Sequence, residues 1–111
     1  MNIIYLIECV NSDSVKYKIG YSKNHKTLVR RLKSIQTGNP DKCTILDTFE
    51  TNHKRKVEIA LHRSLSQCRR EGEWFDLDLV QVTNFKSICE VMENGFDVLK
   101  ENKNPYYGKF I

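Results

Sequence analysis

The sequence predicts an α+β fold in which strands and helices alternate within one domain. Two short apolar runs near the N-terminus are separated by a polar turn, which is typical of a β-hairpin. Two segments with apolar residues at helical spacing follow, and a segment of alternating character lies between them. The 111 residues suffice for one hydrophobic core and are too few for two. The expected order is therefore strand, strand, helix, strand, helix, followed by a C-terminal helical extension.

The N-terminal hairpin is predicted from residues 3–9 and 17–21. The first run carries apolar side chains on both faces, so its strand is expected to be central or covered. Short polar residues at 11–14 supply the turn, because their side chains bond to their own backbone. Gly20 near the end of the second strand would let a backbone or a phosphate approach closely. Tyr5, taken alone, is expected to pack in the core.

The first helix is predicted around Leu28, Leu32 and Ile35, with Asn24 or Thr27 as its cap. Gly38 and Pro40 end it. Arg31 borders the apolar face of this helix, and we expect its side chain to reach the sheet.

The second strand–helix unit covers residues 43–50 and roughly residues 53–68. Strict alternation would place Ile45 and Phe49 on the same side of the third strand. On the helix, Glu58 and His62 are four residues apart and therefore project together.

Beyond this unit the chain contains a short extended piece at residues 73–75 and a predicted helix over residues 79–92, stopped by Asn94-Gly95. A separate further turn of helix is an option for residues 96–99. We expect residues 1–76 to form the core, and residues 77–111 to add the C-terminal helix and an aromatic tail. Tails rich in aromatic rings usually pack, so this tail is expected on the core or on a second subunit.

The remaining composition indicates an intracellular, cytoplasmic protein without a membrane segment. No apolar run is long enough to span a bilayer, and no basic segment of a signal peptide precedes the first strand. The four cysteines lack the spacing of a zinc site, and we expect buried free thiols. His25 and His53 lie in polar, basic stretches and are expected on the surface.

Positive charge is concentrated in the first two thirds of the chain. Residues 1–72 hold 14 Lys/Arg and 7 Asp/Glu, whereas residues 73–111 hold 4 and 7. A basic front favours a polyanionic partner, although lysines that merely keep a small domain soluble give the same pattern. The candidate contacts to a DNA phosphate backbone are Lys23, Lys26, Arg30, Lys33, Lys54 and Arg55. Residues 77–111 hold no recognisable DNA-reading module, so strong sequence specificity would come from loops or from a homodimer.

One group with potential chemistry comes from each of four predicted elements, in the order Tyr5, Lys18, Arg31 and Glu58. With these residues the chain resembles a GIY-YIG nuclease domain, and more specifically the branch found in phage proteins and in the meiotically up-regulated-gene group of fungal proteins. The resemblance covers roughly residues 3–76 and is carried by Ile4-Tyr5, Tyr17-Lys18-Ile19-Gly20-Tyr21-Ser22, Arg31-Leu32, Glu58 with Leu61-His62, and Glu73-Trp74-Phe75.

The resemblance implies a small three-stranded antiparallel sheet flanked by helices, and hydrolysis of DNA phosphodiesters with one divalent metal. Glu58 would be the sole protein ligand of that ion, which suits Mg²⁺ or Mn²⁺ because such hard cations keep several waters. Tyr5 would activate the attacking water or act as nucleophile. Arg31 would stabilise charge on the phosphate during the reaction.

Two positions depart from the family pattern. Lys18 replaces the second family tyrosine and would accept a proton if its pKa is depressed. Ile35 stands where the family often has a His or Tyr, and His62 would supply the missing group; the alternative is a capping or solvent-facing histidine. Glu73 lies near the position of a late family asparagine.

Three hypotheses follow from the sequence. The first is a divalent-metal-dependent endonuclease with a GIY-YIG-type site built from Tyr5, Lys18, Arg31 and Glu58. The second is a catalytically weakened or inactive nucleic-acid-binding module of the same fold. The third is a protein-interaction domain that uses its basic face.

Overall fold

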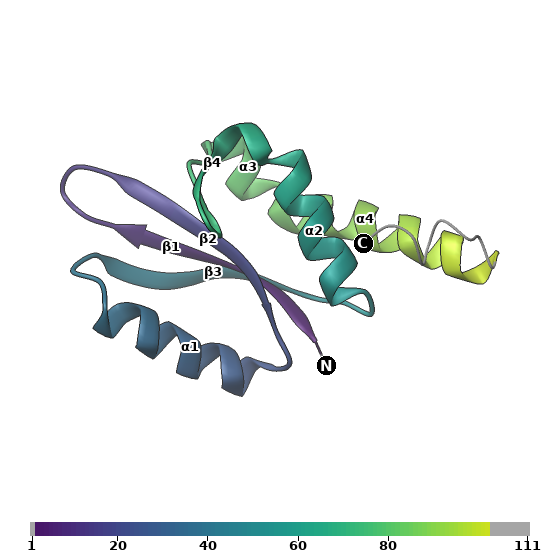
Figure 1. Cartoon of the computed structure of the whole chain (residues 1–111), viewed down its shortest axis with the longest axis horizontal. Coiled ribbons are helices and arrows are strands. Elements are labelled where there is room, and N and C mark those ends of the chain that lie inside the picture. The colour runs from purple at the N-terminus through teal and green to yellow at the C-terminus, as the bar shows by residue number, and fades with distance from the viewer. Residues whose placement is uncertain (1, 103–111) are drawn as a thin grey trace.

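The computed structural model describes residues 2–102, and Figure 1 shows one sheet with helices on both sides of it. The strands are β1 (Ile3–Val10), β2 (Val15–Ser22), β3 (Lys42–Glu50), β4 (Arg69–Glu71) and β5 (Trp74–Phe75). The helices are α1 (His25–Thr37), α2 (Lys54–Ser64), α3 (Leu79–Thr83) and α4 (Phe85–Glu101), with a 3₁₀ turn at Ser66–Cys68. The architecture is α+β. Asn24 caps α1 by accepting a hydrogen bond from the Thr27 backbone N–H at 2.8 Å.

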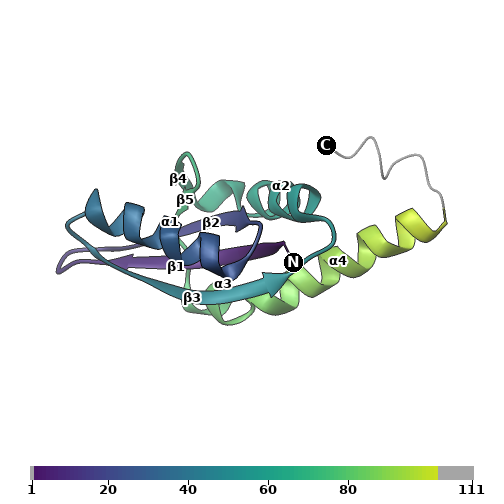
Figure 2. The same ribbon diagram turned by 90° about the horizontal axis from the view of Figure 1, so that it is seen from below.

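The predicted three-stranded sheet is wrong, because the sheet has five strands in the order β3-β1-β2-β5-β4. The pairing is antiparallel, and β1 is bonded along its whole length to β2 and β3, which run beside it in Figure 2. The strands β4 and β5 have three and two residues, too few to show an alternating pattern in the sequence. They exist as strands because a turn at Gly72, with φ of +58°, folds β4 against β5, and β5 in turn pairs with β2.

The strand β1 is buried on both faces, as its apolar pattern predicts. Its residues Ile3, Tyr5 and Ile7 pack with Leu28 of α1 on one face. Residues of β1 on the other face contribute to a larger cluster with α2 and α4, which includes Ile4, Leu6, Val57, Leu61, Phe85, Cys89 and Phe96. Figure 1 accordingly shows α1 and α2 on opposite sides of the strands.

A β-bulge changes the face assignment within β3. The register shifts between Leu6 and Ile7 of β1, whose partners on β3 are Asp47 and Ile45. As a consequence Ile45 packs on the α1 side while Phe49 packs on the α2 side. The prediction that these two residues share a face is therefore wrong, because one extra residue in a strand reverses its alternation.

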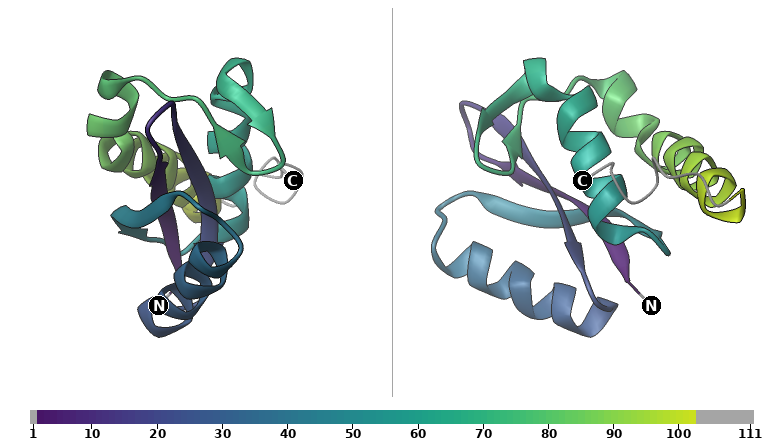
Figure 3. Two further views of the ribbon diagram at one scale, coloured as in Figure 1. Left: turned by 90° about the vertical axis from the view of Figure 1, so that its left-hand side faces the viewer. Right: turned by 45° about the vertical axis from the view of Figure 1, so that its right-hand side comes forward.

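The C-terminal helix is longer than the sequence predicts. It does not stop at Asn94-Gly95 but continues to Glu101, and Figure 3 shows its end projecting away from the sheet. The helix continues because Phe96, one residue beyond Gly95, is buried in the core. That burial outweighs the cost of about 1 kcal/mol for a glycine within a helix.

A polar clamp further attaches α4 to the start of α2. Glu93 accepts hydrogen bonds from the Thr51 hydroxyl at 2.5 Å and the Asn52 backbone N–H at 2.8 Å. His53 Nε2 lies 2.7 Å from a carboxylate oxygen of Asp97. His53 is only 4% exposed, so its predicted surface position is wrong.

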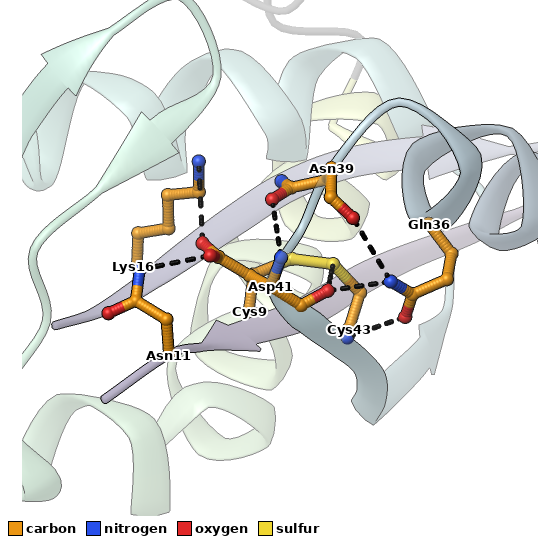
Figure 4. Close-up of a disulfide and its surroundings, with 7 residues drawn as sticks. All are labelled: Cys9, Asn11, Lys16, Gln36, Asn39, Asp41 and Cys43. Atoms are coloured by element: carbon orange, nitrogen blue, oxygen red, sulfur yellow. Dashed lines mark hydrogen bonds and ion pairs between the residues drawn. A yellow bond between two sulfur atoms is a disulfide. The ribbon is translucent and has the colours of Figure 1, made fainter. Parts of the chain in front are cut away.

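The cysteines also differ from prediction, because Cys9 of β1 and Cys43 of β3 form a disulfide while Cys68 and Cys89 are free. The paired strands bring their Cα atoms to 4.1 Å, a closeness that sequence spacing does not reveal. Figure 4 shows the surrounding network, in which Gln36 at the end of α1 accepts from the Cys43 backbone N–H at 2.8 Å and donates to the Asp41 carbonyl at 2.6 Å.

The predicted aromatic tail, including Tyr106, Tyr107 and Phe110, lies outside the described residues. Within residues 2–102, no helix has both the length and the apolar character needed to cross a membrane.

Candidate active site

The candidate site lies where the middle of β1 faces the Gly20 end of β2. Tyr5 is paired with Gly20 across the two strands, and its ring is completely buried on the α1 side of the sheet. Its hydroxyl accepts a hydrogen bond from Nη1 of Arg31 at 3.3 Å. The expectation that Arg31 reaches from α1 to the sheet is thus confirmed, and Tyr5 is both a core residue and a polar member of the site.

Gly20 makes room for this contact. A Cβ atom at this position would lie 2.7 Å from Cζ of Tyr5 and 3.1 Å from Oε1 of Glu73, and closer still to the Tyr5 hydroxyl. Any side chain at position 20 would therefore compete with the phenol for the same space. Glycine is required here for close approach, and the groups that approach are the side chains of Tyr5 and Glu73 rather than a backbone segment.

Burial keeps the Tyr5 phenol protonated. Loss of solvation raises the pKa of Tyr5, against the lowering effect of the Arg31 hydrogen bond, and the nearby carboxylates Glu73 and Glu58 raise it further. At neutral pH the hydroxyl is therefore a hydrogen-bonding group rather than a phenolate.

Glu58 comes from α2, a different element from those that carry Tyr5 and Arg31. Burial raises the pKa of its carboxyl to about 7, the charge of Glu73 acts in the same direction, and Arg55 and Arg31 oppose both. A carboxyl group whose pKa is raised to near neutral by burial and by a second carboxylate is typical of functional sites. Glu58 also lines a surface cavity of about 210 Å³ with His62, Arg63 and Arg69, among others.

We expect the metal-free protein to lose stability as Glu58 ionises. The folded-state pKa of about 7 exceeds the ordinary value of 4.5, so the folded state binds this proton more tightly than the unfolded state does. The contribution is fully present below pH 4.5 and is lost as the pH rises through 7. Urea unfolding across this pH range should show wild type losing stability relative to Glu58→Gln; parallel curves for the two proteins would contradict this assignment.

Lys18 of β2 and Glu73 of the β4–β5 turn complete the candidate site. The ammonium of Lys18 lies 4.0 Å from Oε1 of Glu73 and 5.1 Å from the centre of the Trp74 ring. Lys18 is thus on the Tyr5 side of β2, whereas Tyr17 packs on the opposite side and donates from its hydroxyl to Glu8 at 3.4 Å.

His62 lies on α2, one turn after Glu58, and bonds to the backbone of β2. Its Nε2 lies 3.0 Å from the carbonyl oxygen of Ile19, and since a carbonyl only accepts, this nitrogen carries the proton. The ring also packs edge-on against Phe75, with centroids 4.9 Å apart. His62 links α2 to β2 rather than joining Tyr5 and Arg31.

Most of the predicted phosphate contacts are exposed. Lys23 precedes α1, Lys26, Arg30 and Lys33 lie along it, and Arg55 lies in the first turn of α2. Lys54 is half-buried, with its ammonium 5.4 Å from the centre of the Tyr21 ring. Except for Lys23, these groups belong to α1 and α2, the helices that carry Arg31 and Glu58, so both helices contribute positive charge near the site.

Glu73 is the site residue to which the sequence pattern assigned no role. It lies in the turn between β4 and β5, and its charge acts on Tyr5, Arg31 and Glu58 alike. The one sequence signal was its place within Glu73-Trp74-Phe75, next to an apolar strand.

A separate group of potential metal ligands consists of His53, Glu93 and Asp97, whose ligand atoms all lie within 4.8 Å of one another. These side chains already bond to each other or to Thr51 and Asn52. We therefore interpret them as the clamp between α2 and α4.

Comparison with known proteins places the whole site within one family. Residues 2–92 match the family described as the T5orf172 domain. Over 63 residues the chain is 27% identical to the putative KilA-N domain-containing protein 315L of Invertebrate iridescent virus 6, a match that covers 57% of this chain and 27% of that protein. No solved structure matches the chain. Because the family match extends over most of its length, this protein belongs to the T5orf172 domain family.

Proposed function

We propose that this protein is a divalent-metal-dependent endonuclease that hydrolyses DNA phosphodiester bonds through a GIY-YIG-type site. The observation that carries the proposal is the contact between the Arg31 guanidinium and the buried Tyr5 hydroxyl at the Gly20 end of β2, with Glu58 close enough to affect the pKa of Tyr5. These residues come from three separate elements, and the family resemblance assigns each of them a role in phosphodiester cleavage.

The residues present fit a hard cation such as Mg²⁺ or Mn²⁺. Glu58 offers a half-buried carboxylate, and Oε1 of Glu73 is buried without a hydrogen-bond partner among the described residues. Such oxygens are the ligands that Mg²⁺ prefers, together with water and phosphate. When bound, the ion would polarise the phosphate and make water more acidic.

The chain's own residues would position the phosphate and move protons. Arg31 would bind two phosphate oxygens through its planar guanidinium and stabilise the charge that develops on them. Tyr5, held protonated by burial, would orient the attacking water through its hydroxyl. Lys18, at the edge of the site, would contact the phosphate or accept a proton. The basic residues of α1 and α2 would bind the DNA backbone with little sequence preference.

A second candidate function is DNA binding without cleavage. Two observations favour it: Lys18 replaces a tyrosine and lies near Glu73, and His62 bonds to the Ile19 carbonyl. The family match and the KilA-N domain named in the viral relative are compatible with either function.

One experiment separates the two functions. Purified protein is incubated with supercoiled plasmid and with single-stranded DNA, in Mg²⁺, Mn²⁺ or chelator. Cleavage that requires the metal and stops with chelator supports the nuclease. Retarded DNA without any cleavage supports the binding module, and cleavage that persists in chelator contradicts the proposed mechanism. Absence of DNA binding even at low salt would leave only the protein-interaction hypothesis.

We expect Arg31→Lys to slow cleavage by roughly 10–100-fold, because a lysine keeps the charge but cannot bind two phosphate oxygens at once. DNA affinity at low salt should change little, since it comes mainly from the other basic residues. Rates under saturating protein and gel-shift affinities would measure the two effects. Arg70→Lys is the control, because Arg70 is exposed and pairs with Asp76 at 3.5 Å. Equal losses in both variants would argue against a role for Arg31.

A further inference from the structure

Glu73 is held firmly at the site by its backbone. Its carbonyl accepts a hydrogen bond from the Ile19 backbone N–H at 3.2 Å, and the next residue, Trp74, is paired with Lys18 in the sheet. The preceding turn at Gly72 adopts a left-handed conformation that directs the chain back onto β2. The Glu73 side chain is therefore placed by the sheet rather than by a loose loop.

The carboxylate of Glu73 points inward and lacks a bond at its buried oxygen. Oε1 accepts no hydrogen bond from the described residues and has almost no contact with solvent. It lies against the same side of Gly20 as the Tyr5 hydroxyl does. The Lys18 ammonium, 4.0 Å away, is too far for a hydrogen bond.

This arrangement is costly unless a cation completes it. The buried oxygen loses its solvation without gaining a hydrogen bond, and the ion pair with Lys18 at 4.0 Å offsets only part of this cost. A second carboxylate, Glu58, lies one helical turn before His62, whose ring bonds to the Ile19 carbonyl, while the Ile19 N–H donates to the Glu73 carbonyl. Arg31 already donates to Tyr5, so the site holds two acidic groups with incomplete compensation. A divalent ion bound by oxygen ligands would give the buried Glu73 oxygen the partner that it lacks among the described residues.

We propose that Glu73 is a second carboxylate ligand of the divalent ion, so that Glu58 from α2 and Glu73 from the β4–β5 turn bind the same cation. The proposal rests on the proposed function for the presence of a metal, and it changes the expected site from one protein ligand to two. Two carboxylates bind a hard cation more tightly than one, so the chain should bind Mn²⁺ measurably in the absence of DNA.

The test measures Mn²⁺ binding by the full chain at mildly alkaline pH. The concentration of free Mn²⁺ is read from its electron paramagnetic resonance signal. Glu58→Gln and Glu73→Gln should each weaken binding by at least about tenfold, which is the range for loss of a ligand or its support. Glu73→Asp should recover part of the loss. Glu71→Gln is the matched control, because Glu71 is an exposed carboxylate in the neighbouring strand β4. Unchanged Mn²⁺ affinity in Glu73→Gln would overturn the proposal.

Two further measurements separate metal binding by Glu73 from a structural role of this residue and from metal binding elsewhere in the chain. Mn²⁺ should raise the melting temperature of wild type but not of Glu73→Gln, while the metal-free variant melts at or above the wild-type temperature, a pattern that a merely structural role would not produce. Asp97→Asn tests the clamp formed with His53 and Glu93. If this variant, and not Glu73→Gln, loses Mn²⁺, the ion binds at the clamp and the proposal is wrong.

The Mn²⁺-binding and DNA-cleavage experiments together distinguish a failure of the Glu73 proposal from a failure of the proposed nuclease function. Metal-dependent cleavage with unchanged Mn²⁺ binding in Glu73→Gln would keep the nuclease and remove Glu73 as a ligand. Mn²⁺ binding that needs both carboxylates, without any DNA cleavage, would keep the ligand pair and remove the nuclease. No Mn²⁺ binding by wild type, even with DNA present, would overturn both.

Discussion

The Glu58→Gln variant is expected to cleave DNA at least about 10³-fold more slowly than wild type, because it loses the charge that binds the catalytic ion. Glutamine has nearly the same size and shape as glutamate, so the packing of α2 against the sheet should remain. The variant also lacks the carboxyl group whose pKa is about 7. Without metal, Glu58→Gln should therefore be more stable than metal-free wild type at pH values above 7. Nicking of supercoiled plasmid and urea unfolding would measure the two effects.

The combination of lost activity with gained stability distinguishes a functional residue from a structural one. Glu90→Gln is the control, because Glu90 is an exposed carboxylate on α4. It should leave both quantities unchanged. If Glu58→Gln cleaves DNA at the wild-type rate, the nuclease site assigned to α2 is wrong.

The Gly20→Ala variant is expected to lose both activity and stability. Its Cβ would lie 2.7 Å from Cζ of Tyr5, closer than atoms pack, and the completely buried ring has little freedom to move away. Such overpacking costs about 1–3 kcal/mol of unfolding free energy. A displacement of the Tyr5 hydroxyl by about 1 Å would slow cleavage by about 10²-fold.

Two other glycines provide controls for this variant. A Cβ at Gly38 would make only an ordinary contact of 3.8 Å with the Ser34 carbonyl, and one at Gly95 would meet nothing within 4 Å. Gly95→Ala should stabilise α4 by about 0.5–1 kcal/mol, since alanine is the better helix former. Both controls should cleave DNA at the wild-type rate. Equal behaviour of all three variants would show that position 20 has no special role.

The local elements of this protein could be predicted from the sequence, because each depends on neighbouring residues. The N-terminal hairpin, the cap at Asn24 and the apolar stripe of α1 follow from turn chemistry and periodicity. The contact of Arg31 with the sheet followed in the same way, since its position next to Leu28 and Ile35 directs its side chain toward the core.

The features that the sequence predicted wrongly all depend on contacts between different elements of the chain. Pairing of β1 with β3 decides the disulfide between Cys9 and Cys43, and a bulge in that pair decides which face Phe49 occupies. Burial of Phe96 decides that α4 continues past Gly95. None of these leaves a local pattern, because the stabilising partners belong to other strands and helices.

Glu73 shows the same difference between local sequence pattern and tertiary packing at the candidate site. The sequence by itself determined the order of Tyr5, Lys18, Arg31 and Glu58 and the elements that carry them. Only the tertiary structure decided that a two-residue strand would place Glu73 beside Gly20 and leave its oxygen unbonded within the described part of the chain. The physical reason is that spacing fixes the side of an element on which a residue lies, whereas the groups that surround it depend on how the elements pack.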